Sequence, residues 1–191
     1  TSSLVGSEMC IRDSTVTVQV RDLRSDTIPE ALMQEMRSSI IFLGAVLGRS
    51  GSCHLSYPGG CELGPRPIDM HLDALRQMGA HFSVHGGQLD CTAPEGLHGA
   101  AIHLPFPSVG ATENVMLAAV LAEGRTVLHN AAREPEICDL AAFLRTCGAD
   151  IAGDGESTLV IRGVERLKGG RYAIMPLSLI HISEPTRLDV I

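Results

Sequence analysis

The sequence repeats itself, and this repetition is the feature that most restricts the fold. The segment A-L-R-Q-M-G-A that begins at Ala74 returns as F-L-R-T-C-G-A at Phe143, 69 residues later. Farther along, E-G-L-H-G from Glu95 returns as E-R-L-K-G from Glu165, 70 residues later. A nearly constant spacing between similar segments indicates two copies of one structural unit.

Each copy predicts the order helix, strand, helix, strand, strand. The first helices, expected at residues 36–47 and 113–121, have apolar side chains at helical spacing, with glycine beyond their ends. The second helices open after a proline and end at a Gly-Ala pair, and a glycine-containing hairpin follows each one. The other expected features are strands at 54–57 and 126–129, helix starts after Pro67 and Pro135, helix ends at Gly79 and Gly148, and hairpins at Gly86-Gly87 and Gly153 to Gly155.

One such unit cannot bury both its helices and its sheet. We therefore expect two units, at about residues 36–105 and 111–176, to share a core with the helices inside, in the α/β (α+β) class. Residues 15–20 are typical of the last strand of a further unit whose beginning is missing. Residues 1–14 and 177–191 resemble translated adapter sequence and are expected to be non-native tails; the alternative is a pair of native tails.

The composition argues against nucleic-acid and membrane partners. Of the 191 residues, 45% are hydrophobic and 19% charged, which is typical of a globular protein. Aromatic residues make up 3%, there is no Trp, and the net charge is −7, so nucleic acid finds neither stacking platforms nor a basic field. The longest apolar run, Ile40 to Gly48, is far shorter than the ~20 residues that span a bilayer.

The cysteines and histidines do not form a metal motif. There are six Cys and eight His, with no C-x-x-C and no H-E-x-x-H, so we expect no metal and no cofactor. His81, His85 and Cys91 are the one set that a hairpin could gather, and scattered core or surface positions are the favoured interpretation. Irregularly spaced cysteines fit a reducing cytosol, so a cytoplasmic location is expected.

The two copies differ most in one loop. From Leu55 to Ile68 the chain takes 13 steps, whereas the matching path from Leu128 to Ile137 takes 9, so the first copy has four extra residues. They fall in a stretch rich in Gly and Pro, residues 58–71. A repeat that departs from its own template in one loop marks a place where function has been added.

Cys61 is the residue in this loop that can carry chemistry. Glycines flank the cysteine, and Arg66 comes directly before an expected helix start, a combination that favours an accessible thiol beside an anion. The alternative is an inert thiol packed into an ordinary connector.

Three long motifs carry a resemblance to a known family. They are P-G-G-C-x-x-G-x-R-P-I-D-x-H at residues 58–71, P-S-V-G-A-T-E-N at 107–114 and N-A-A-R-E-P-E-I at 130–137. In this order they resemble the UDP-N-acetylglucosamine 1-carboxyvinyltransferases, also called UDP-N-acetylglucosamine enolpyruvyl transferases. The resemblance covers about residues 15–176 and marks the chain as an internal fragment.

The resemblance implies a fold and an activity. The fold is the inside-out α/β barrel of the enolpyruvyl transferases, built from βαβαββ units, and the family has a second such domain that this chain is expected to lack. The activity transfers enolpyruvyl from phosphoenolpyruvate to the 3'-hydroxyl of UDP-N-acetylglucosamine, through a tetrahedral ketal, in the first committed step of peptidoglycan synthesis. The fragment alone is expected to be inactive.

The resemblance also implies the site. Cys61 matches the general acid that can form an adduct with phosphoenolpyruvate and is the target of fosfomycin. The residues that match substrate contacts are Arg37, Arg66, Pro67, Ile68, Asp69, Met70, His71, Ser108, Val109 and Gly110. Phe106 stands where some relatives have lysine.

Structural alternatives stay open for several of these residues. Pro67 and Asp69 can be ordinary first-turn helix residues, His71 a surface histidine, and Ser108 with Gly110 a turn before a helix. For the whole protein, the alternatives are enolpyruvyl transfer to shikimate 3-phosphate on the same fold, against which Cys61 argues, and a non-catalytic binding or regulatory relative.

Overall fold

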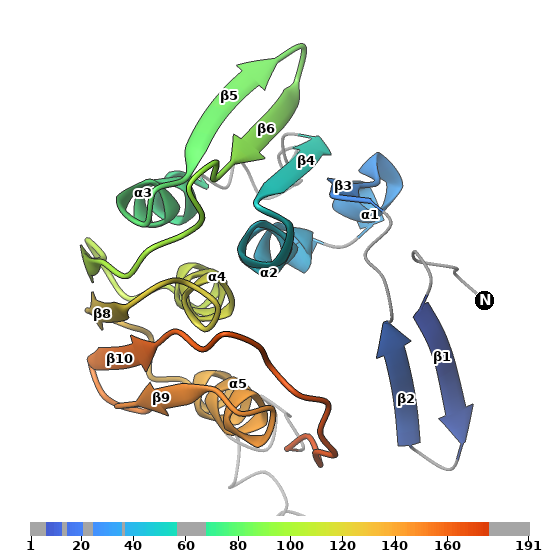
Figure 1. Ribbon diagram of the computed structural model, residues 1–191, viewed down its shortest axis with the longest axis vertical. Helices are drawn as coiled ribbons and strands as arrows, with labels where there is room; N and C mark the ends of the chain where they lie inside the picture. Colours follow the sequence, from blue (N-terminus) through green and yellow to red (C-terminus); the bar gives the residue numbers. More distant parts are fainter. Residues whose placement is uncertain (1–6, 13–14, 21–24, 36, 57–67, 176–191) are drawn as a thin grey trace, which may run out of the picture.

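The computed structural model describes residues 7–12, 15–20, 25–35, 37–56 and 68–175 of the chain. These residues form two four-stranded sheets, a separate two-stranded hairpin and the helices that connect and cover the strands (Figure 1). None of the helices described combines the length and the apolar character needed to cross a bilayer.

The first sheet has the strand order β3-β4-β6-β5. Strand β3 runs parallel to β4, and the other pairs are antiparallel. In chain order, the elements of this part are β3 (Thr27–Ile28), α1 (Glu30–Glu35), the 3-10 helix η1 (Arg37–Ile41), α2 (Phe42–Ser50), β4 (Ser52–Ser56), α3 (Asp69–Gln77), β5 (His81–His85) and β6 (Gln88–Thr92).

The second sheet repeats this topology, with the strand order β7-β8-β10-β9 and a parallel pair between β7 and β8. Its elements are β7 (Ala101–His103), α4 (Val109–Ala119), β8 (Arg125–His129), α5 (Pro135–Thr146), β9 (Asp150–Ala152) and β10 (Thr158–Arg162). The second part follows the order β-α-β-α-β-β that the family resemblance implied, and the first part follows it with α1, η1 and α2 in the place of its first helix. The mixed α/β class is confirmed. The exact boundaries of the two units stay a prediction.

The strand registers align the two copies residue by residue. Leu55 on β4 lies opposite Leu89, and Leu128 on β8 lies opposite Leu159, and all four side chains are buried. Leu55 and Leu128 are therefore equivalent positions. The four extra residues of the first copy consequently lie between β4 and α3.

The central helices lie between the two sheets (Figure 1). Helix α2 contacts β4, α4 contacts β8 and β10, and α2 and α3 both pack on α4. Some of the largest fully buried side chains, such as Leu43, Leu75 and Met116, come from these three helices, and others, such as Leu89 and Leu128, come from the strands. The helices are thus inside and the sheets outside, as expected, although the strands described do not close into a barrel.

The N-terminal side differs from the sequence prediction in two respects. The helix expected at 36–47 is instead 3-10 over Arg37–Ile41 and α-helical over Phe42–Ser50. The strand expected at 15–20 is β2 (Thr15–Val20), and its partner is β1 (Ser7–Arg12), which lies within the segment expected to be a tail. Every residue of β2 is exposed, and the hairpin stands apart from the sheets (Figure 1). That residues 1–14 are non-native stays a prediction.

Candidate substrate-binding site

The structure describes one predicted binding segment in full, residues 108–110, and the second part of another, residues 68–71. Ile68 directly precedes α3, and Asp69, Met70 and His71 form the first turn of that helix. Ser108 directly precedes α4, which Val109 and Gly110 open. Three predicted residues, Cys61, Arg66 and Pro67, lie outside the described residues, and Arg37 is described only as the first backbone position of η1.

The start of α3 turns its polar and apolar side chains to different sides. Ile68 is buried in the core, Met70 packs partly against the core, and Asp69 is exposed in the first turn. A carboxylate in the first turn stabilises a helix through its interaction with the helix dipole. This stabilisation is sufficient to explain why an aspartate stands at position 69. His71 is only 8% exposed, so the alternative of a surface histidine is wrong.

The start of α4 is capped by Ser108. Its backbone is extended, and its Oγ accepts a hydrogen bond from the N–H of Ala111 at 3.4 Å. The first turn of α4 holds no acidic residue. Because the first N–H groups of a helix have no partner within the helix, the amides of Val109 and Gly110 are available to an acceptor at this end.

The two segments meet, although they are about 40 residues apart in the chain. A Cβ placed on Gly110 would lie 3.2 Å from Cε1 of His71 and 3.6 Å from its Nε2. The edge of the imidazole therefore lies against the first turn of α4, at a position where the absence of a side chain leaves it room. The structure thus brings together residues 68–71 and 108–110.

The buried side chain of Asn114 supports the contact between His71 and the start of α4. The sequence alone gave this residue no role. Its side chain is completely buried, with Oδ1 accepting from the N–H of Gly44 at 2.6 Å. Its Nδ2 lies 3.1 Å from the carbonyl oxygen of Ile40 and 3.0 Å from Nδ1 of His71. An amide in the middle of an otherwise apolar helix face, between Ala111, Val115 and Ala118, was the signal that could have found it.

Burial controls the charge of His71. Its removal from water lowers the pKa of the ring from 6.5 to about 4. No ionisable side chain is among the contacts of the ring in the described structure. The imidazole is therefore neutral at physiological pH.

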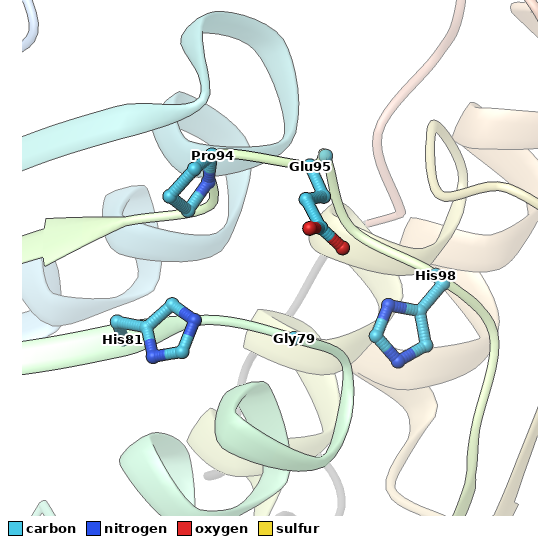
Figure 2. Close-up of a pocket in the computed structure, with 6 residues that line it drawn as sticks. Gly79, His81, Pro94, Glu95 and His98 are labelled. Atoms are coloured by element: carbon cyan, nitrogen blue, oxygen red, sulfur yellow. The ribbon is translucent and has the colours of Figure 1, made fainter.

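The cavity shown in Figure 2 lies away from this junction. It has a volume of about 240 Å³ and is lined by Gly79, His81, Pro94, Glu95, Gly96 and His98. Gly79 follows the C-terminal end of α3, whereas the predicted contacts lie at its N-terminal start, so the length of the helix separates the two places. The cavity is therefore not the predicted binding site.

The two histidines and the cysteine of the β5-β6 hairpin do not form a cluster. Cys91 lies opposite Phe82 on the neighbouring strand and is buried, whereas His81 and His85 alternate with Phe82 and are exposed. Over the described ranges, no three His, Cys, Asp or Glu side chains are arranged to hold a metal ion.

Comparison with known proteins decides the family. The family model described as EPSP synthase (3-phosphoshikimate 1-carboxyvinyltransferase) matches residues 5–177. The UDP-N-acetylglucosamine 1-carboxyvinyltransferase of Acidiphilium cryptum is 54% identical over 148 residues, which are 78% of this chain and 35% of that protein. The chain belongs to the UDP-N-acetylglucosamine 1-carboxyvinyltransferase family.

Other members of the family give the same result. The enzyme of the same name from Gluconobacter oxydans is 51% identical over 81% of this chain and 37% of its own length. That from Oleidesulfovibrio alaskensis is 48% identical over 92% of this chain and 42% of its own length. The chain thus spans well under half the length of these relatives.

Solved structures confirm the fold. The enolpyruvyl transferase NikO from Streptomyces tendae matches with a TM-score of 0.70 and 24% identity, over 84% of this chain and 38% of that one. An EPSP synthase from Acinetobacter baumannii matches with a TM-score of 0.66 and 24% identity, over 86% and 38%. The predicted enolpyruvyl transferase fold is therefore confirmed.

The buried histidine gives the folded chain a specific sensitivity to acid. Because burial disfavours the charged ring, the folded state binds this proton less readily than the unfolded state does. The contribution of His71 is therefore intact above about pH 6.5 and is lost as the pH falls toward its folded pKa of about 4. The loss amounts to up to about 3 kcal/mol.

Urea unfolding at pH 7 and at pH 4.5 measures this effect. We expect the free energy of unfolding to fall more between these pH values in the unsubstituted chain than in His71→Gln, which has no ring to protonate. Equal losses in the two proteins would contradict the burial of a neutral His71.

Proposed function

We propose that this chain carries the nucleotide-sugar side of an active site that transfers enolpyruvyl from phosphoenolpyruvate to the 3'-hydroxyl of UDP-N-acetylglucosamine. This is the first committed step of peptidoglycan synthesis, and we propose that it takes place in the cytoplasm. The observation that carries the proposal is the 54% identity over 148 residues to a protein named for this reaction. Relatives at 51% and 48% identity bear the same name.

The geometry of the described residues supports a role in substrate binding. The starts of α3 and α4 meet at His71 and Gly110, and both belong to motifs that the family resemblance implicates in contacts with the UDP-sugar. The first turn of α4 has backbone donors without a partner within the helix and no acidic side chain, a combination that suits an anionic or oxygen-rich ligand. We propose that Ile68, Asp69, Met70, His71, Ser108, Val109 and Gly110 contact the nucleotide sugar, together with Arg37, Arg66 and Pro67.

The proposed chemistry needs one proton donor in the loop before α3. We propose that the Cys61 thiol gives its proton to the methylene carbon of phosphoenolpyruvate, while the 3'-oxygen of the sugar bonds to the adjacent carbon and loses its own proton. The resulting tetrahedral ketal then releases phosphate and a proton from the new methyl group. A thiol suits the first step because it keeps its proton near neutral pH and still releases it readily.

The other functions considered have weaker support. Likeness to EPSP synthase structures, at 24% identity, concerns the fold alone, and the loop with Cys61 argues against shikimate 3-phosphate as the acceptor. A non-catalytic relative is not expected to show labelling of Cys61 that responds to the nucleotide sugar, so the labelling experiment below distinguishes the two functions.

Labelling by fosfomycin tests the role of Cys61. We expect mass spectrometry of the digested chain to find the adduct at Cys61, and we expect UDP-N-acetylglucosamine to change its rate of formation at least several-fold. Shikimate 3-phosphate should leave the rate unchanged.

The other cysteines provide controls within the same sample. Burial raises the pKa of Cys53 to about 12 and raises that of Cys91, so these thiols should stay unlabelled. Cys138 is half-buried, and burial also raises its pKa, so Cys138→Ser should leave the labelling unchanged while Cys61→Ser should abolish it. Equal labelling of Cys61 and Cys138, with no response to the UDP-sugar, would refute the proposal.

We further propose that the 191-residue chain does not turn over alone. It spans 35% to 42% of the length of the three relatives compared, and half of a cleft cannot orient two reactants. With the purified chain, the rate of phosphate release from phosphoenolpyruvate in the presence of UDP-N-acetylglucosamine should therefore equal the rate measured in a sample without protein. Turnover by the purified chain would refute this proposal.

A further inference from the structure

The orientation of the Asn114 amide is fixed by its backbone neighbours. A backbone N–H can only donate, so the side-chain atom that faces the N–H of Gly44 at 2.6 Å must be the oxygen. A backbone carbonyl can only accept, so the atom that faces the carbonyl of Ile40 at 3.1 Å must be the nitrogen. Both contacts require the same orientation.

This orientation determines the tautomer of His71. The NH₂ group of Asn114 has two hydrogens, of which one points to Ile40 and the other is available to His71 Nδ1 at 3.0 Å. A hydrogen bond from NH₂ requires Nδ1 of the ring to accept, and Nδ1 then carries no proton. In a neutral imidazole the proton must therefore be on Nε2.

The Nε2–H group lies where the two binding segments meet. It is next to Gly110, and in the described structure Asn114 is the one hydrogen-bond partner of the ring. With 8% of the residue exposed, the ring has little freedom to turn. Its donor is therefore held in a fixed direction beside the first amides of α4, which have no partner within the helix.

We propose that Asn114 is a positioning residue that fixes His71 as the neutral Nε2–H tautomer, so that the ring presents a permanent donor to an acceptor oxygen of the nucleotide sugar. The ligand in this inference rests on the proposed function, whereas the tautomer and its dependence on Asn114 do not. A neutral donor fixed in this way selects for an acceptor at one point of the ligand and keeps its proton when the pH varies around neutrality.

Nitrogen-15 NMR of the histidine rings in the unsubstituted chain tests the tautomer at pH 7. We expect a pyridine-type shift for Nδ1 of His71 and a pyrrole-type shift for Nε2. His54 is an internal control with the opposite state at Nδ1, because this atom faces the carboxylate oxygen of Asp90 at 2.6 Å and must donate. A protonated Nδ1 in His71 would overturn the proposal.

The variant Asn114→Asp tests the positioning role. A carboxylate keeps the acceptor for Gly44 but offers Nδ1 of His71 an acceptor in place of a donor. We expect Nδ1 to become protonated and the midpoint of the His71 titration to rise by more than about one pH unit. An unchanged His71 spectrum in the folded variant would overturn the role of Asn114, and the result for the unsubstituted chain stands if the variant does not fold.

Addition of UDP-N-acetylglucosamine separates this inference from the proposed function. We expect the Nε2–H signal of His71 and the amide signal of Gly110 to shift with the ligand, and to shift less in Asn114→Asp. The expected tautomer without any response to the UDP-sugar would support the inference about Asn114 and overturn the nucleotide-sugar site.

Discussion

The arrangement of the central helices depends on one buried carboxamide. In a continuous α-helix the carbonyl of Ile40 and the N–H of Gly44, four residues apart, would bond to each other. Here both bond to the side chain of Asn114 from helix α4. If the carboxamide lost one of these contacts, the buried N–H or carbonyl group left without a partner would cost its full desolvation free energy. Helices α2, α3 and α4 are therefore held to one geometry.

Gly44 makes this contact sterically possible. A Cβ on this residue would lie only 2.2 Å from the backbone oxygen of Asn114, and one turn later a Cβ on Gly48 would lie 3.3 Å from that of Ala118. Helices α2 and α4 therefore approach along a line of small residues, in an interior that tolerates no added atoms. Because α2 and α4 occupy equivalent places in the two copies, this contact also joins the copies. The starts of α3 and α4, where substrate contacts are proposed, take their places from the same core.

The sequence predicted the repeated parts well and the non-local parts poorly. The hairpins and the ends of α3 and α5 were foreseen, because glycines with positive φ at Gly79 and Gly148 act within a few residues of the chain. The helix expected at 36–47 instead begins as 3-10 helix, and the partner at this junction, Asn114, is 74 residues from Ile40. The burial of His71 was missed for the same reason, because its partner Asn114 is 43 residues away in the sequence. Local patterns do not report such partners.

The candidate site was foreseen unevenly for a different reason. Its binding segments were found through motifs, and the structure brings two of them into contact at His71 and Gly110. Cys61 and Arg66 lie outside the described residues, so their roles stay proposals. Asn114 was part of a recognised motif, yet a motif indicates that a residue matters without indicating what it touches.

Hydrogen exchange at the backbone amide of Gly44 tests most directly whether Asn114 organises the central helices. If the N–H of Gly44 stays hydrogen-bonded to the buried carboxamide, it should exchange only through global unfolding, as slowly as the amides in the core of α4. Exchange as rapid as that of the exposed turn at Gly86 and Gly87 would show that the contact opens on its own, and would contradict the account.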